Sequence, residues 1–177
     1  QPVARQRIRE GGRPVRPVEQ TRFVQVNGQR EDLRVPRFEE HRLALYHGAN
    51  SIDAVELNPQ MTKLVQETHA EFAGFVYDDP RITVHTSEAR GFVAQSGTQY
   101  DLIHIGLLDS FSASGAGVYA QSESYIYTKE AIREYLEHTT PGGLLAITRS
   151  LKLPPRDGLK LVATAIDTLR TMGVSKP

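Results

Sequence analysis

The stretch of this sequence best suited to chemistry is an apolar run that ends on an acid. Residues 51–57, Ser-Ile-Asp-Ala-Val-Glu-Leu, predict a short buried strand with Glu56 at its carboxyl end. Open α/β sheets bind ligands at that edge, where a carboxylate can accept hydrogen bonds from both hydroxyls of a ribose. Asn58-Pro59 then breaks the strand and is typical of a helix start. The alternative is that Glu56 is an ordinary surface acid at a strand end.

Two later segments add candidate site residues. Ser87 is placed to cap a helix over residues 88–95, with Glu88 and Ala89 in its first turn. The Ser/Ala/Gly-rich loop 109–121 follows a strand and is of the kind that forms lids over active sites. The histidines show no metal-ligand spacing with acids, so we predict no metal site.

Strands alternate with helices over the region that positions these residues. We expect strands at 51–57, 81–85, 100–107 and 144–148, and helices over about 59–72, 88–95, 128–138 and 157–172. Thr128 and Asp157 are the predicted caps of the last two helices, and Gly173 closes the final one. This alternation predicts right-handed crossovers and a mostly parallel sheet, which is an α/β fold.

The amino-terminal part follows a different pattern. Residues 21–26 alternate between polar and apolar types and run into Asn27-Gly28, which predicts a small β-hairpin. We therefore divide the chain into an Arg-rich arm with a hairpin, 1–40, and an α/β domain, 41–177. A nucleotide-binding α/β domain also needs a first strand that leads into a glycine-rich turn. We find neither before His41 and no strand after Val174, so either this fold is reduced or segments are absent from the chain. Because the sequence begins with Gln1, we interpret it as a fragment or processed product.

The composition and charge of the chain argue against some classes of binding partner. The 177 residues carry 21 basic and 21 acidic side chains, so no bulk charge attracts nucleic acid or membranes. Residues 1–37 hold nine Arg and no Lys against four acids, which we interpret as a solvated arm with nucleic-acid binding the weaker alternative. With no cysteine, the chain fits a reducing compartment, and we expect a cytoplasmic protein. No apolar run approaches the roughly 18 residues that a membrane span needs.

The order and spacing of five motifs resemble the core of the spermidine synthases over residues 43–175. The motifs are Asp53-Ala-Val-Glu-Leu-Asn-Pro59, Asp79-Pro-Arg-Ile-Thr-Val-His85, Ser87-Glu-Ala-Arg90, Tyr100-Asp-Leu-Ile-His-Ile105 and Pro141-Gly-Gly143. These polyamine aminopropyltransferases have the Rossmann-like fold of S-adenosylmethionine-dependent methyltransferases. The resemblance implies that fold, a small amino-terminal β unit, S-adenosylmethionine or its decarboxylated form as co-substrate, and a small amine as acceptor. It leaves a homodimer open.

The resemblance also implies roles for particular residues. Glu56 would hold the ribose hydroxyls, and Glu88, with the neighbouring Ala89, would lie at the adenine amino group. Helix-dipole stabilisation is an equally weighted alternative for Glu88. Asp109 occupies the second acid of the family's Asp-x-x-Asp acceptor motif, and Tyr127 or Tyr125 stands where the family brings in a tyrosine.

One departure from the family pattern bears on the chemistry. The first acid of the acceptor motif, to which the family assigns the base role, is replaced here by Gly106. Arg149 stands where the family often has Gln and could bind a carboxylate. We therefore keep three functions open: aminopropyl transfer, a catalytically degenerate binding or regulatory homologue, and methyl transfer on the same fold.

Overall fold

The structure is a computed structural model of the chain, and it describes residues 22–27, 39–106, 125–149 and 154–177. The strands are β1 (Arg22–Asn27), β2 (Ser51–Glu56), β3 (Ile82–Thr86), β4 (Tyr100–Ile105) and β5 (Thr139–Ile147). The α-helices are α1 (Glu39–Tyr46), α2 (Pro59–Lys63), α3 (Ala89–Gln95), α5 (Lys129–Glu137) and α6 (Arg156–Thr171). A π-helical turn, η2 (Leu64–Thr68), and a 3-10 turn, η3 (Val76–Asp78), complete the described elements.

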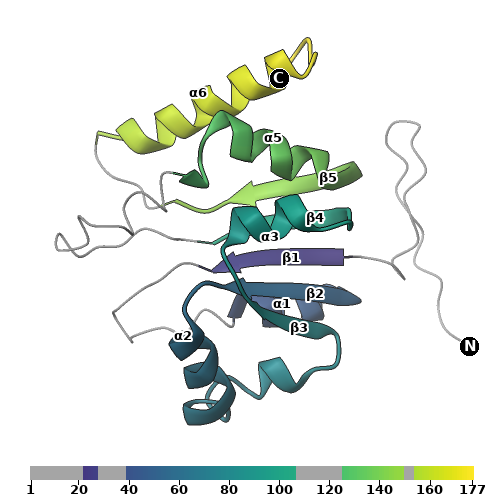
Figure 1. Cartoon of the computed structure of the whole chain (residues 1–177), viewed down its shortest axis with the longest axis vertical. Helices are drawn as coiled ribbons and strands as arrows, with labels where there is room; N and C mark the ends of the chain where they lie inside the picture. Colours follow the sequence, from purple (N-terminus) through teal and green to yellow (C-terminus); the bar gives the residue numbers. More distant parts are fainter. Residues whose placement is uncertain (1–21, 28–38, 107–124, 150–153) are drawn as a thin grey trace, which may run out of the picture.

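The five strands form one parallel sheet in the order β3-β2-β1-β4-β5 (Figure 1). The chain builds outward from β1 to β3, then returns to the other side of β1 for β4 and β5. In open α/β sheets this reversal of order creates the ligand crevice, at the carboxyl ends of the strands. The predicted Rossmann-like fold with a mostly parallel sheet is therefore confirmed.

The amino-terminal hairpin that we predicted at residues 21–30 is wrong. Residues 22–27 form β1, the central strand, which pairs in parallel with β2 on one side and β4 on the other. The first strand that we could not find in the sequence is thus present. Residues 28–38, where a glycine turn would follow it, lie outside the described residues. So does the arm at 1–21, and the division of the chain at residue 40 stays a prediction.

Apolar side chains fill both faces of the sheet. Helices α3 and α5 cover one face, and α1 covers part of the other (Figure 1). The first core includes Val24, Val55, Ile103, Ile105, Val93 and Tyr135. The second includes Ile52, Ala54, Val65 and Val76, with Ala44 and Leu45 of α1 packed against it. Helix α6 packs on α5, where Lys129 pairs with Asp167. In the described part of the chain, no helix is long and apolar enough to cross a bilayer.

Element boundaries differ from the prediction at two places. The helix expected over 59–72 changes at Lys63 to a π-helical turn, in which the His69 amide donates to the Leu64 carbonyl at 2.8 Å. The strand expected at 144–148 begins at Thr139, so the predicted stop at Pro141-Gly-Gly143 lies inside β5. A register shift opposite Tyr100–Leu102 accommodates it. Gly143 is required there, because a Cβ would lie 2.7 Å from Thr139 Cγ2.

Candidate functional site

Glu56 lies at the carboxyl end of β2 with only 5% of its surface exposed. Its Oε1 accepts a hydrogen bond from the Asn58 amide at 2.9 Å, and its carbonyl accepts one from the Ser87 amide at 3.1 Å. Asn58 caps α2 through its side chain, and Pro59 follows at the first helical position, as predicted. Glu56 is therefore not the exposed acid of our alternative interpretation, because a local backbone turn holds its carboxylate in a buried position.

The negative charge of Glu56 acts on a neighbouring phenol. Burial and, secondarily, the Glu56 carboxylate raise the pKa of Tyr77 well above its usual range. Tyr77 also contacts the ring of His41 edge-on, with 5.5 Å between ring centroids. Tyr77 thus belongs to the buried surroundings of Glu56, and His41 packs against Tyr77. Sequence reasoning missed both residues, because no local pattern indicates these contacts.

Glu88 is the N-cap of α3, a position that we had assigned to Ser87. Its Oε1 accepts from the Arg90 amide at 2.9 Å and its Oε2 from the Gly91 amide at 2.7 Å. Glu88 thus stabilises α3 as its cap, one position before the first turn in which we had placed it, and an adenine contact stays a prediction. Ala89 follows as the first residue of α3 and is buried in the core that includes Val55.

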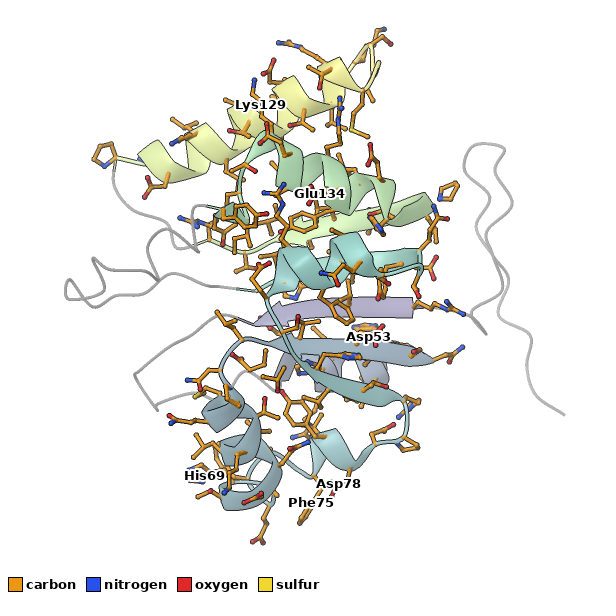
Figure 2. The ribbon with its side chains drawn as sticks, viewed as in Figure 1. Asp53, His69, Phe75, Asp78, Lys129 and Glu134 are labelled. Atoms are coloured by element: carbon orange, nitrogen blue, oxygen red, sulfur yellow. The ribbon has the colours of Figure 1, made fainter. Side chains whose placement is uncertain are left out.

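Arg90 links the start of α3 to α5 and to the segment before it. The buried guanidinium donates to both carboxylate oxygens of Glu134, from Nε at 2.7 Å and Nη2 at 2.8 Å. Figure 2 labels Glu134 on α5. Its Cζ lies 4.0 Å from the centroid of the Tyr125 ring, and Nη1 reaches the Tyr125 carbonyl at 3.4 Å. The hydrogen bonds from Arg90 lower the pKa of the Glu134 carboxyl. Arg90 belongs to one of the five motifs, but no local pattern indicates this role, because its partner is 44 positions away.

Tyr127 and Arg149 come together at the carboxyl edge of β5. The Arg149 guanidinium lies 4.3 Å from the centroid of the Tyr127 ring. Tyr127 also packs against the core beneath α5, whereas Tyr125 is half exposed. Thr128 caps α5 by accepting a hydrogen bond from the Ala131 amide at 3.2 Å, as predicted.

The remaining candidate residues lie at different places, and some lie outside the described residues. Asp109 and the predicted lid lie outside the described residues, so their roles stay predictions. Gly106, at the end of β4, is buried. Asp101 has a structural role, accepting hydrogen bonds from Thr140 Oγ1 at 2.7 Å and from the Arg22 amide at 3.0 Å. Asp157 does not cap α6, which begins one residue earlier. The described residues contain no cluster of three metal-ligating side chains.

Solved structures with the same fold include spermidine synthases and methyltransferases. Spermidine synthase from Thermotoga maritima matches with a TM-score of 0.54 at 12% identity, over 86% of this chain and 45% of that one. A spermidine synthase in complex with the transition-state analogue AdoDATO matches with a TM-score of 0.54 at 13% identity, over 86% of this chain and 44% of that one. A candidate methyltransferase from Streptococcus mutans in complex with SAH matches with a TM-score of 0.52 at 13% identity, over 84% of this chain and 73% of that one.

These likenesses establish the fold of the domain. The chain has a Rossmann-like methyltransferase fold and spans less than half the length of the two spermidine synthase chains. No protein-family profile matches the sequence, and no curated protein matches it.

Proposed function

We propose that this domain binds an adenosyl sulfonium nucleoside at the carboxyl edge of β1 and β2 and transfers its aminopropyl group to a small amine. The observation that carries the proposal is the buried carboxylate of Glu56 at the end of β2, beside the point where the strand order reverses. A carboxylate in that position is suited to two ribose hydroxyls, because it can accept several hydrogen bonds at once.

The reaction requires little from the protein beyond positioning and proton removal. The amine nitrogen attacks the aminopropyl carbon beside the sulfonium, a C–N bond forms, and the C–S bond breaks with its electron pair going to sulfur. Methylthioadenosine leaves. Only a neutral amine carries the lone pair that attacks, so a protein base must first take a proton from the ammonium group of the substrate. We assign the holding of the amine to Asp109 and a supporting hydroxyl to Tyr127, whose ring lies against Arg149.

Two observations favour the alternative of a binding homologue without turnover. Gly106 replaces the acid to which the resembling family assigns the base role. Two backbone amides of α3 also occupy the Glu88 carboxylate oxygens, which reduces their capacity to accept from an adenine amino group. Methyl transfer to another acceptor fits the same fold and is the third candidate.

Calorimetric titration with S-adenosylmethionine, its decarboxylated form and methylthioadenosine separates these candidates. Binding of the decarboxylated form, together with turnover of putrescine, supports aminopropyl transfer. Binding of any ligand without turnover on amines supports the alternatives, and no binding of all three contradicts nucleoside recognition altogether.

Two substitutions test the assigned residues. Glu56→Gln should weaken nucleoside binding about 10- to 100-fold, because a charged acceptor of ribose hydroxyls becomes a neutral one. Glu71→Gln, at an exposed acid, is the matched control and should leave affinity unchanged. Asp109→Asn should abolish amine turnover and spare nucleoside binding. If Glu56→Gln binds the nucleoside as tightly as the unaltered chain, the site is elsewhere.

A further inference from the structure

A hollow of about 340 Å³ lies at the opposite edge of the sheet from the proposed nucleoside site. Its lining includes Arg81, which directly precedes β3, and Tyr46, the last residue of α1. The Ile52 amide of β2 donates to the Arg81 carbonyl at 2.8 Å, which places the hollow beside the amino ends of β2 and β3. Glu56 lies at the other end of β2, roughly 17 Å away along the strand. The hollow is therefore separate from the site of the proposed transfer.

Two guanidinium groups and one carboxylate line the hollow. The carboxylate of Asp79 binds Arg81, because its Oδ1 accepts from Nε at 2.9 Å and its Oδ2 from Nη2 at 2.7 Å. Arg42, on α1, makes no hydrogen bond or ion pair with any residue in the described ranges. Its guanidinium lies against Gly74, where a Cβ would be 3.5 Å from Nη1. The lining groups thus carry one net positive charge, and the guanidinium of Arg42 can bind an anion.

Two aromatic side chains at the hollow are turned toward solvent. Tyr46 is 85% exposed and Phe75 is 55% exposed. Phe75 has a φ of 52° and a ψ of 35°, in the left-handed region that bulky residues rarely adopt. An exposed ring gains little burial to offset this conformation, so packing does not explain a phenylalanine at this position. Residues held in such conformations concentrate at binding sites, where the ring can contact a ligand.

The inner wall of the hollow is apolar. Val76 belongs to the second core, and Leu45 packs against that core. An apolar wall, exposed rings and a guanidinium together suit a planar apolar group that carries a carboxylate or a phosphate. The single net positive charge favours a monoanion, whereas a phosphate monoester carries about 1.5 to 2 negative charges at pH 7 and would be repelled by Asp79. Figure 2 shows Phe75 beside Asp78, beyond the β3 side of the sheet.

We propose that this hollow binds a small aromatic monocarboxylate. The Arg42 guanidinium binds the carboxylate through two parallel hydrogen bonds, and the rings of Tyr46 and Phe75 contact the aromatic part of the ligand. Arg81, held in place by Asp79, adds a second positive group at the same hollow. The volume is within the range of small-molecule sites. This site goes beyond the proposed transfer and does not depend on it.

Titration with 2-naphthoate, followed by amide NMR spectra of the whole chain, tests the site. The shift changes should saturate with a dissociation constant of about 1 mM or tighter, which is the affinity expected for a ligand of this size. They should be concentrated in residues 42–46 and 74–81. The uncharged 2-naphthamide should bind at least about 10-fold more weakly, because it has the same rings but no charge. The dianionic 2-naphthyl phosphate should bind no more tightly than 2-naphthoate.

Two substitutions assign the contacts. Arg42→Gln should weaken the binding of 2-naphthoate at least about 10-fold, because it removes the cation that binds the carboxylate. Arg133→Gln, at an exposed arginine on α5, is the matched control and should leave affinity unchanged. Phe75→Asn should weaken binding about 2- to 10-fold, since it removes the ring but suits the left-handed conformation. Neither Arg42→Gln nor Phe75→Asn should unfold at a lower urea concentration, because both side chains are largely exposed.

Four results overturn the proposal. The first is the absence of saturable shifts up to about 10 mM 2-naphthoate, roughly ten times the expected dissociation constant. The second is a set of shifts centred on Glu56 instead, because the ligand would then occupy the nucleoside site. The third is equal affinity in Arg42→Gln and Arg133→Gln. The fourth is tighter binding of the phosphate than of the carboxylate, which would contradict the charge assigned to the ligand.

Discussion

The ion pair between Arg90 and Glu134 should contribute measurably to stability, and Glu134→Gln isolates that contribution. The substitution keeps the size of the side chain and removes the negative charge opposite a guanidinium that is 10% exposed. Glu134 binds Arg90 through both of its carboxylate oxygens, and Tyr125 contacts Arg90 through its ring and its carbonyl. Loss of the carboxylate leaves the positive charge buried with weaker partners.

The expected loss in the free energy of unfolding follows from the exposure of the two side chains. Removing one partner of a fully buried pair costs about 3–5 kcal/mol, whereas an exposed pair contributes about 0–1 kcal/mol. Since the Glu134 side chain is 31% exposed, water screens part of the interaction and we expect a loss of about 2 kcal/mol in the free energy of unfolding. For a domain of this size, such a loss lowers Tm by about 4–8 °C.

Urea unfolding at pH 7 measures the loss, with Glu137→Gln on the exposed side of the same helix as control. The control should change stability by less than about 0.5 kcal/mol. Because Arg90 lowers the pKa of Glu134, the contribution is present above the ordinary value of 4.5 and disappears as the pH falls through the lowered one. The difference between Glu134→Gln and the unaltered chain should therefore shrink in acid.

The double variant Arg90→Met/Glu134→Leu tests whether the loss comes from the unpaired charge. It replaces both charges by apolar side chains and should recover most of the stability lost by Glu134→Gln, since no buried charge is left unpaired. A loss below about 0.5 kcal/mol for Glu134→Gln at pH 7, or a difference that persists unchanged in strong acid, would refute the reasoning.

Three further predictions concern single groups. Gly143→Ala should destabilise the domain by about 1–3 kcal/mol in urea unfolding, because its Cβ would lie 2.9 Å from the Asp101 carbonyl oxygen. The neighbouring Gly142→Ala should cost only about 1 kcal/mol of backbone strain, at its φ of +89°. Equal losses for the two variants would contradict this prediction. Burial raises the pKa of Tyr100 to about 12, so stability should fall as the pH rises from 10 through 12, and Tyr100→Phe should flatten that fall. The Asp79 carboxyl, bound by the Arg81 guanidinium, should titrate in a carboxyl-detected NMR experiment with a midpoint near 2, shifting to near its ordinary 3.8 in Arg81→Gln.

Local patterns predicted the parts of the fold that depend on neighbouring residues. The apolar runs that became β2, β3 and β4 and the helices between them establish a parallel α/β domain without any tertiary information. Asn58-Pro59 was predicted as a helix start and Thr128 as a cap, because a cap satisfies amides only two or three residues away. Gly173 closes the last helix with a φ of +88°, for the same local reason.

The failures involve partners distant in sequence or competing local roles. Asn27-Gly28 is a strong hairpin signal, yet β1 pairs with strands that begin at residues 51 and 100, and these contacts override the local turn preference. Glu88 could have served either a helix or a ligand, and only coordinates show both of its oxygens bound by amides.

The central position of β1 has a consequence for how the chain folds during synthesis. The Arg22 amide donates to a carboxylate 79 positions later, on Asp101 of β4. At about 5–20 residues per second, a ribosome makes that partner roughly 4–16 s after the strand itself. The backbone groups of β1 that pair with β4 therefore stay without these partners for seconds while the ribosome extends the chain. This interval is when the domain is most exposed to pairing with the wrong strand.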